Sequence, residues 1–227
     1  MSRRVFIPFG VGRPGGGLRD LDAVPVDLAR MGRSFEARGY AVAPVAPDLE
    51  AAEARAALGA LLDAAALGPD DAAVLYFSGH GCVVDGDHYL AARGFSSDRA
   101  AATGVKTQEL LEIVTRRRPR AGKVWLILDC CGAGGALHEA LSRGLGAAGA
   151  QVFVLAASAA WSSTFDGSFS AAFVEALDAE TSLAAGPSLD ELVATVNARR
   201  REARVMAAAL CWSRFDLLDE PPGRRAA

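Results

Sequence analysis

The chain has 227 residues with a formal net charge of −3, and 51% of its residues are hydrophobic while 22% are charged. This is the composition of an ordinary folded protein with enough apolar side chains to fill a core, and it excludes a disordered chain. The weak net charge and the short basic runs at 116–120 and 199–204 argue against nucleic acid as the main partner, because such runs commonly cap helix ends.

No segment predicts export or membrane insertion. The apolar run Val5–Phe9 is too short for a secretory signal and is interrupted by Pro8. No run reaches the roughly 18 apolar residues that a membrane span requires. The four cysteines show no C-x-x-C pair, and two of them, Cys130 and Cys131, are adjacent, which suits a reducing compartment. We therefore expect a cytoplasmic protein without a membrane partner.

Short apolar runs alternate with helical periodicity along the chain. Leu28, Met31 and Phe35 recur at helical spacing, Gly39 follows as a C-terminal stop, and Asp48 is the expected N-cap of a long helix. The expected strands are Val5–Phe9, Tyr40–Val45, Ala72–Phe77, Val124–Leu128, Val152–Ala156 and Leu210–Leu218, with a hairpin over Val83–Ala91 turning at Asp85-Gly86. The expected helices are Asp27–Arg38, Asp48–Ala66, Thr107–Arg116, Leu137–Leu145, Ser168–Leu177 and Leu189–Met206, with a mobile glycine-rich loop at Gly10–Gly17.

This alternation predicts an α/β fold with a mainly parallel central sheet that carries helices on both faces. We expect one domain over residues 1–220, without internal repeats, and a disordered tail over residues 221–227. Sheets of this kind bind ligands beyond the carboxyl ends of their strands. The residues that follow the third and fourth strands are therefore the first candidates for a site.

Two of these strand ends carry reactive side chains. The third strand runs into Ser78-Gly79-His80-Gly81 and the fourth into Asp129-Cys130-Cys131. A thiolate attacks as a nucleophile, and a neighbouring imidazole takes its proton and later protonates a leaving amine. Backbone N–H groups of Gly81 and Cys131 are candidates for holding an oxyanion. The scheme requires no acidic residue to orient His80, and the sequence identifies none.

These two motifs resemble those of a known family. Phe-Ser-Gly-His-Gly at 77–81 is similar to the Tyr-Ser-Gly-His-Gly motif of metacaspases and bacterial caspase-like proteins, and Asp129-Cys130-Cys131 is similar to their Asp-x-Cys motif. His80 and Cys131 are 51 positions apart, close to the spacing of about 50 in caspases. The resemblance spans Val5 to about Leu218. It implies a caspase-like three-layer sandwich and a cysteine endopeptidase that works through a thioester acyl-enzyme without a cofactor.

The resemblance also implies a substrate preference. Metacaspases cleave after Arg or Lys, and their two pocket carboxylates correspond here to Asp129 and Asp27, with Ser78 as a neutral wall. Caspases instead cleave after Asp and use arginines, for which Arg19 is the available candidate. We expect basic substrates. The acidic cluster of calcium-dependent metacaspases is reduced here to three separate aspartates, so calcium activation is not expected.

Several alternatives remain open. His88 and His138 are interpreted as surface or packing residues, and Cys82, Cys130 and Cys211 as packing residues. The set His80, Cys82, Cys130 and Cys131 matches no zinc spacing, so no metal is expected. A catalytically silent caspase-like adaptor and a plain α/β binding domain compete with the peptidase. A peptidase would act on protein or peptide substrates, and an activating partner or upstream protease would regulate it, with Arg143 and the run at 116–120 as candidate processing sites.

Overall fold

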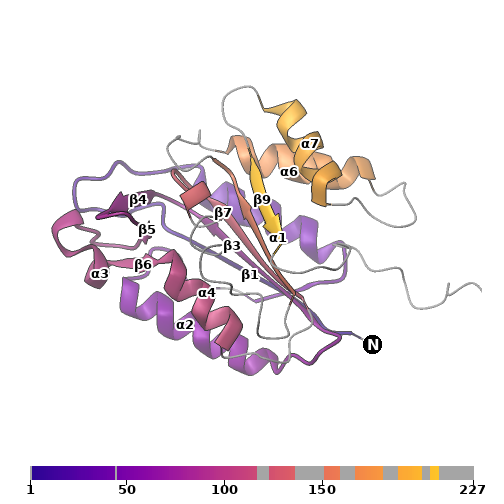
Figure 1. Ribbon diagram of the computed structural model, residues 1–227, viewed down its shortest axis with the longest axis horizontal. Helices are drawn as coiled ribbons and strands as arrows, with labels where there is room; N and C mark the ends of the chain where they lie inside the picture. Colours follow the sequence, from indigo (N-terminus) through magenta and orange to yellow (C-terminus); the bar gives the residue numbers. More distant parts are fainter. Residues whose placement is uncertain are drawn as a thin grey trace, which may run out of the picture.

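A six-stranded sheet forms the centre of the molecule (Figure 1). The computed structural model describes residues 2–43, 45–116, 123–135, 151–158, 167–180, 189–200 and 205–209. The strands follow the order β2-β1-β3-β7-β8-β9, in which the first five are parallel and β9 pairs antiparallel with β8. They are β1 (Arg4–Gly10), β2 (Ala41–Val42), β3 (Ala72–Ser78), β7 (Lys123–Asp129), β8 (Gln151–Ala156) and β9 (Met206–Ala209). The expected mainly parallel α/β fold is confirmed.

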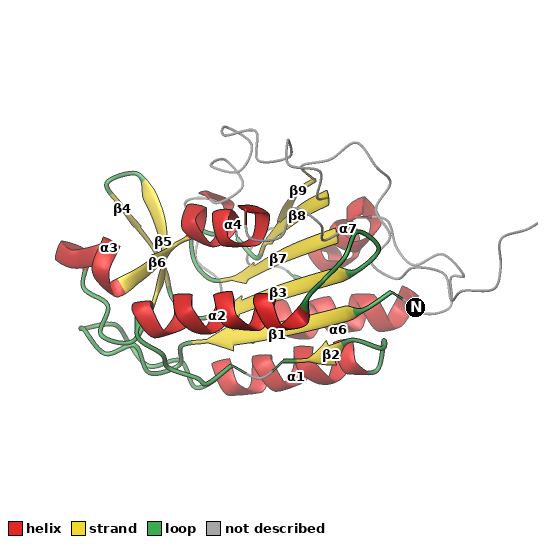
Figure 2. Cartoon of the chain, turned by 90° about the horizontal axis from the view of Figure 1, so that it is seen from below, coloured by secondary structure: helices red, strands yellow, loops and turns green. Residues whose placement is uncertain are grey.

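Helices cover both faces of this sheet (Figures 1 and 2). Ala73, Leu75 and Phe77 of β3 face one layer, which contains α2 and α4, whereas Val74 and Tyr76 face the layer of α1, α6 and α7. Since successive side chains of a strand point to opposite faces, the continuous apolar run of β3 serves both cores. The helices are α1 (Val24–Glu36), α2 (Ala51–Ala65), α4 (Thr107–Arg116), α6 (Ser168–Glu180) and α7 (Leu189–Arg199). No helix in the described ranges is long and apolar enough to cross a membrane.

A second, three-stranded sheet lies beyond the carboxyl end of β3 (Figure 2). It consists of β4 (Gly81–Val84), β5 (Asp87–Ala91) and β6 (Gly104–Lys106), all antiparallel. The predicted hairpin is confirmed: Asp85 and Gly86 have φ of 52° and 84°, the positive values that a tight two-residue turn requires. Sequence periodicity missed β6 and the short helical turns before it, η1 (Ser97–Arg99) and α3 (Ala100–Thr103).

Other predictions are corrected at their boundaries. Helix α1 begins at Val24 rather than Asp27, because Pro25 suits the first turn of a helix. The prediction that Asp48 is the N-cap of α2 is wrong. Glu50 caps this helix, in a reciprocal capping box with Glu53. Asp48 instead has φ of 55°, and its carboxylate accepts the N–H groups of residues 12 and 13 at 2.7 and 2.8 Å.

The boundaries of the C-terminal elements also differ from the prediction. Helix α7 ends at Arg199 and not at Met206, which instead begins β9. The Asn197 amide binds both backbone groups of Val205, at 2.7 and 3.1 Å, and these bonds hold the returning chain beside the helix. Strand β2 is also shorter than the predicted Tyr40–Val45. The predicted helix Leu137–Leu145, the predicted strand Leu210–Leu218 and the tail 221–227 lie outside the described residues.

The Asp71 side chain connects the segment before β1 with the segment before β3 through hydrogen bonds. Its carboxylate accepts the backbone N–H of Arg3 at 2.6 Å and that of Gly68 at 2.7 Å, and the Arg3 guanidinium also contacts it. Burial would raise the pKa of Asp71, yet these N–H groups and the guanidinium lower it below its ordinary value. The charged form is therefore stabilised in the folded protein.

We expect Asp71→Asn to lower the free energy of unfolding by about 1–3 kcal/mol at pH 7, because hydrogen bonds to a charged acceptor are lost. A depressed pKa contributes stability that is present above the unfolded value of about 4 and is lost as the pH falls through the folded value. Urea unfolding at pH 7 and pH 3 measures this, and the difference between variant and wild type should shrink at the lower pH. An equal difference at both values would contradict the assignment.

Candidate active site

The two reactive strand ends meet at one edge of the sheet. In the β3–β7 ladder Ser78 pairs with Asp129, and the Gly79 N–H extends the contact to the Asp129 carbonyl at 3.3 Å. His80 and Cys131 each stand two residues beyond this last pair. Both side chains are half-buried. The topology therefore brings the imidazole and the thiol to neighbouring strand ends.

The backbone of the loop after β1 orients His80. The ring nitrogen Nε2 of His80 lies 2.8 Å from the carbonyl oxygen of Arg19, which is an acceptor, so Nε2 carries the proton. The other nitrogen, Nδ1, is then the basic one. No sequence signal could have predicted this orienting group, since every residue has a carbonyl. The exposed Arg19 thus contributes through its main chain to this contact.

The environments of the two adjacent cysteines differ. Cys130 is fully buried in the core, and burial, together with the nearby charges of Asp129 and Cys131, raises its pKa well above the ordinary value. Such a thiol is a poor source of thiolate. Cys131 is half-buried at the strand end. Cys82 is also half-buried, and burial followed by the charge of Cys131 raises its pKa.

Hydrogen bonds to three carbonyl groups of the turn that carries Cys131 hold this turn in place. Ser158 Oγ donates to the Cys130 carbonyl at 3.0 Å, and Nε2 of His88 donates to the Cys131 carbonyl at 3.0 Å. The next carbonyl, of Gly132, accepts the N–H of Gly135 at 2.9 Å. Three successive peptide groups are therefore fixed by three different segments. The interpretation of His88 as a packing residue missed its contact with this turn, although the side chain is indeed buried.

The small sheet also fixes the backbone around His80. The Ala91 N–H of β5 donates to the His80 carbonyl at 2.9 Å. His80 is therefore in a hydrogen-bonded position, and Gly81, opposite Leu90, is in the next position, where the N–H of an antiparallel strand points away from its partner. The Gly81 N–H therefore makes no hydrogen bond to β5, although Gly81 itself belongs to the β4–β5 ladder.

The predicted pocket residues lie on a single polar network. Ser78 Oγ is 3.4 Å from Asp27 Oδ2, and the Tyr76 hydroxyl donates to Asp129 Oδ2 at 3.0 Å. Burial, then the charges of Asp129 and Asp27, raise the pKa of Tyr76 well above its ordinary value, while a hydrogen bond from Ser78 lowers it. The two carboxylates therefore act on the same phenol. Tyr76 was missed because it lies within a strand whose pattern is wholly apolar.

Asp27 already has a cation beside it. Arg30, one turn later on α1, places Nη1 3.2 Å from Asp27 Oδ1, and the same Arg30 nitrogen lies 2.5 Å from Ser170 Oγ on α6. Ser170 in turn donates to Asp27 Oδ1 at 2.5 Å. Asp27 and Asp129 are only 2% and 6% exposed. The network therefore combines two buried carboxylates with the guanidinium of the half-buried Arg30.

No metal centre emerges from the described part of the chain: it contains no group of three or more His, Cys, Asp or Glu side chains suited to a metal ion. His138 and Cys211 lie outside the described residues.

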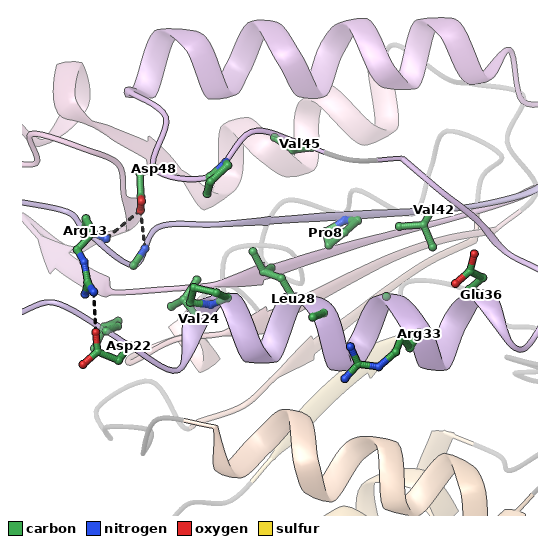
Figure 3. A pocket seen from close by; sticks show the side chains of 16 residues that line it. Pro8, Arg13, Asp22, Val24, Leu28, Arg33, Glu36, Val42, Val45 and Asp48 are labelled. Carbon is green, nitrogen blue, oxygen red and sulfur yellow. Dashed lines mark hydrogen bonds and ion pairs between the residues drawn. The ribbon is translucent and has the colours of Figure 1, made fainter.

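A separate cavity of about 700 Å³ lies along another side of α1 (Figure 3). Val24 and Leu28 of α1 and Pro8 and Val42 of the sheet line it, with Arg33 and Glu36 at one end. Neither His80, Cys131 nor the carboxylates Asp27 and Asp129 contribute to it. The candidate active site is therefore distinct from this cavity.

Comparisons with known proteins agree with this architecture. A crystal structure of a protein from Geobacter sulfurreducens matches with a TM-score of 0.70 at 16% identity, covering 97% of this chain and 98% of that one. Caspase-1 from Spodoptera frugiperda matches with a TM-score of 0.73 at 14% identity, covering 98% of this chain and 92% of the other. At these identities the likeness shows the fold. A sequence search among curated proteins finds no match.

The family comparison covers most of the chain. The model described as the caspase domain matches residues 10–217, a span that contains both reactive strand ends, His80 and Cys131. The chain belongs to the caspase domain family.

Proposed function

We propose that this protein is a cysteine endopeptidase in which Cys131 is the nucleophile and His80 the general acid and base. The observation that carries the proposal is the equivalent position of the two residues beyond the β3–β7 ladder, with His80 held through Nε2 by the Arg19 carbonyl. This contact leaves Nδ1 to take the thiol proton. The thiolate attacks the peptide carbonyl, and the protonated imidazole then protonates the departing amine. Water hydrolyses the thioester that remains.

The oxyanion of the tetrahedral intermediate is assigned to the backbone N–H groups of Gly81 and Cys131. Support comes from the ladder register, which turns the Gly81 N–H away from β5. Such preorganised donors contribute about 3–4 kcal/mol to lowering a barrier of this kind. No cofactor takes part in this scheme.

We further propose that the enzyme cleaves after Arg or Lys. Asp27, Ser78 and Asp129 would recognise the basic side chain. The supporting observation is that this network already accommodates one guanidinium, that of Arg30, which pairs with Asp27, and that it contains a second buried carboxylate, Asp129, which accepts the Tyr76 hydroxyl. An acidic substrate side chain would meet two buried carboxylates and be repelled.

Fluorogenic peptides that differ only in the residue before the cleaved bond test both proposals. We expect turnover of the Arg and Lys peptides and none of the Asp peptide. Turnover of the Asp peptide alone would overturn the proposed specificity while leaving the peptidase in place. No turnover of any peptide or protein substrate would instead favour the silent adaptor.

Asp129→Asn probes the specificity separately. We expect the ratio of kcat/KM for an Arg peptide over its neutral citrulline analogue to fall about 10- to 100-fold, because a charge-assisted contact becomes neutral. Asp98→Asn, at an exposed carboxylate near the small sheet, is the matched control and should leave the ratio unchanged. An unchanged ratio in the Asp129 variant would remove this residue from substrate recognition.

A further inference from the structure

A buried histidine, His88, lies behind the proposed nucleophile. His88, on β5 of the small sheet, is 1% exposed and Thr107, the first residue of α4, is fully buried. His88 Nδ1 lies 2.7 Å from Thr107 Oγ1, and His88 Nε2 lies 3.0 Å from the Cys131 carbonyl oxygen. Both ring nitrogens therefore make short polar contacts in a buried place.

These contacts fix the state of the ring. The Cys131 carbonyl can only accept a hydrogen bond, so Nε2 carries the proton. In the neutral ring Nδ1 then accepts a hydrogen bond from the Thr107 hydroxyl. Burial lowers the pKa of His88, although the bond to the Cys131 carbonyl opposes this. The neutral ring has one donor and one acceptor, which match the Cys131 carbonyl and the Thr107 hydroxyl.

The hydrogen bond from His88 to the Cys131 carbonyl influences the orientation of the Cys131 side chain. A hydrogen bond to the Cys131 carbonyl fixes the plane of the peptide group between Cys131 and Gly132, and with it the backbone angle that aims the Cα–Cβ bond. Gly132 follows with φ of 67°, so the chain turns sharply just after this peptide. Without the imidazole, the carbonyl would be left without this donor at the centre of the turn.

We propose that the Thr107–His88 pair positions the nucleophile turn, His88 through its hydrogen bond to the Cys131 carbonyl and Thr107 by holding the imidazole in the required orientation. His88 is a positioning residue and touches no reacting atom. The same small sheet holds the His80 carbonyl through Ala91. A single antiparallel unit therefore fixes the backbone of both members of the proposed dyad. The inference rests on the proposed role of Cys131 as nucleophile.

Two substitutions of similar size separate this role from packing. In His88→Gln the amide nitrogen takes the place of Nε2 and still reaches the Cys131 carbonyl. In His88→Asn the shorter amide reaches towards Thr107 only. We expect His88→Asn to lower kcat about 10- to 100-fold with KM nearly unchanged, because a misplaced nucleophile loses this much rate. His88→Gln should retain kcat within about threefold, and Thr107→Val should fall between the two.

Alkylation of Cys131 by iodoacetamide, followed by mass spectrometry of the Cys131 peptide, provides a readout that does not need peptide turnover. We expect the rate to fall in His88→Asn and to be preserved in His88→Gln, with both variants melting at similar temperatures. Equal kcat and equal alkylation in the two variants would overturn the inference. If the wild type alkylates at Cys131 but cleaves no peptide, the proposed peptidase fails, and the alkylation rates alone still decide the role of His88.

Discussion

Replacing Cys131 with alanine is expected to abolish peptide turnover, a loss of about 10⁴-fold or more, because the residue supplies the attacking atom. His80→Ala should cost about 10²- to 10⁴-fold, since proton transfer to the leaving amine is lost while the thiol remains. Steady-state hydrolysis of a fluorogenic Arg peptide measures both. The two losses should not add in the double variant, because the pair acts as a unit.

The neighbouring cysteine provides the control for this experiment. Cys130 is fully buried and its pKa is raised well above the ordinary value, so Cys130→Ala should keep turnover within about tenfold of the wild type while costing some stability through the small cavity. If Cys130→Ala were the inactive variant and Cys131→Ala the active one, the nucleophile would be misassigned. Turnover that persists in both would point to a contaminating protease.

Gly81→Ala is expected to lower both activity and stability, because the site leaves no room for a Cβ atom. A Cβ at this position would lie 2.1 Å from the Cys131 carbonyl oxygen, 2.7 Å from His88 Nε2 and 3.0 Å from Cys130 Sγ. None of these atoms is the mobile end of an exposed side chain. We expect a loss of about 1–3 kcal/mol of unfolding free energy and of about 100-fold or more in kcat, as overpacking displaces the nucleophile turn.

Gly32→Ala is the matched control within the same chain. Gly32 lies on α1, and the nearest atom to an added Cβ is Val42 Cγ1 at 3.9 Å, an ordinary contact. Alanine is the better helix former, so this variant should be unchanged or more stable by up to about 1 kcal/mol. Chemical denaturation and peptide hydrolysis on both variants check the prediction. A Gly81→Ala enzyme with wild-type kcat would show that the turn tolerates displacement.

The sequence determined the elements that carry the site. Hydrophobic runs with turn signals located β1, β3, β7 and β8, and helix α4 begins and ends where its periodicity predicted, at Thr107 and Arg116. The flanking glycines and the strand ends then singled out His80 and Cys131, because each of them follows a buried parallel strand. These are local signals, and a single strand with its following turn contains all of them.

The groups that surround that pair could be identified only from the folded arrangement. The Arg19 carbonyl at His80 and the His88 ring at the Cys131 carbonyl come from residues whose types predict nothing about these contacts. Backbone carbonyls are identical in every residue, and a buried histidine in a short hairpin has the same local pattern whether it packs or positions. The local sequence pattern therefore indicates where the reactive side chains lie. Their orientation depends on contacts between segments far apart in the chain, which come together only in the folded protein.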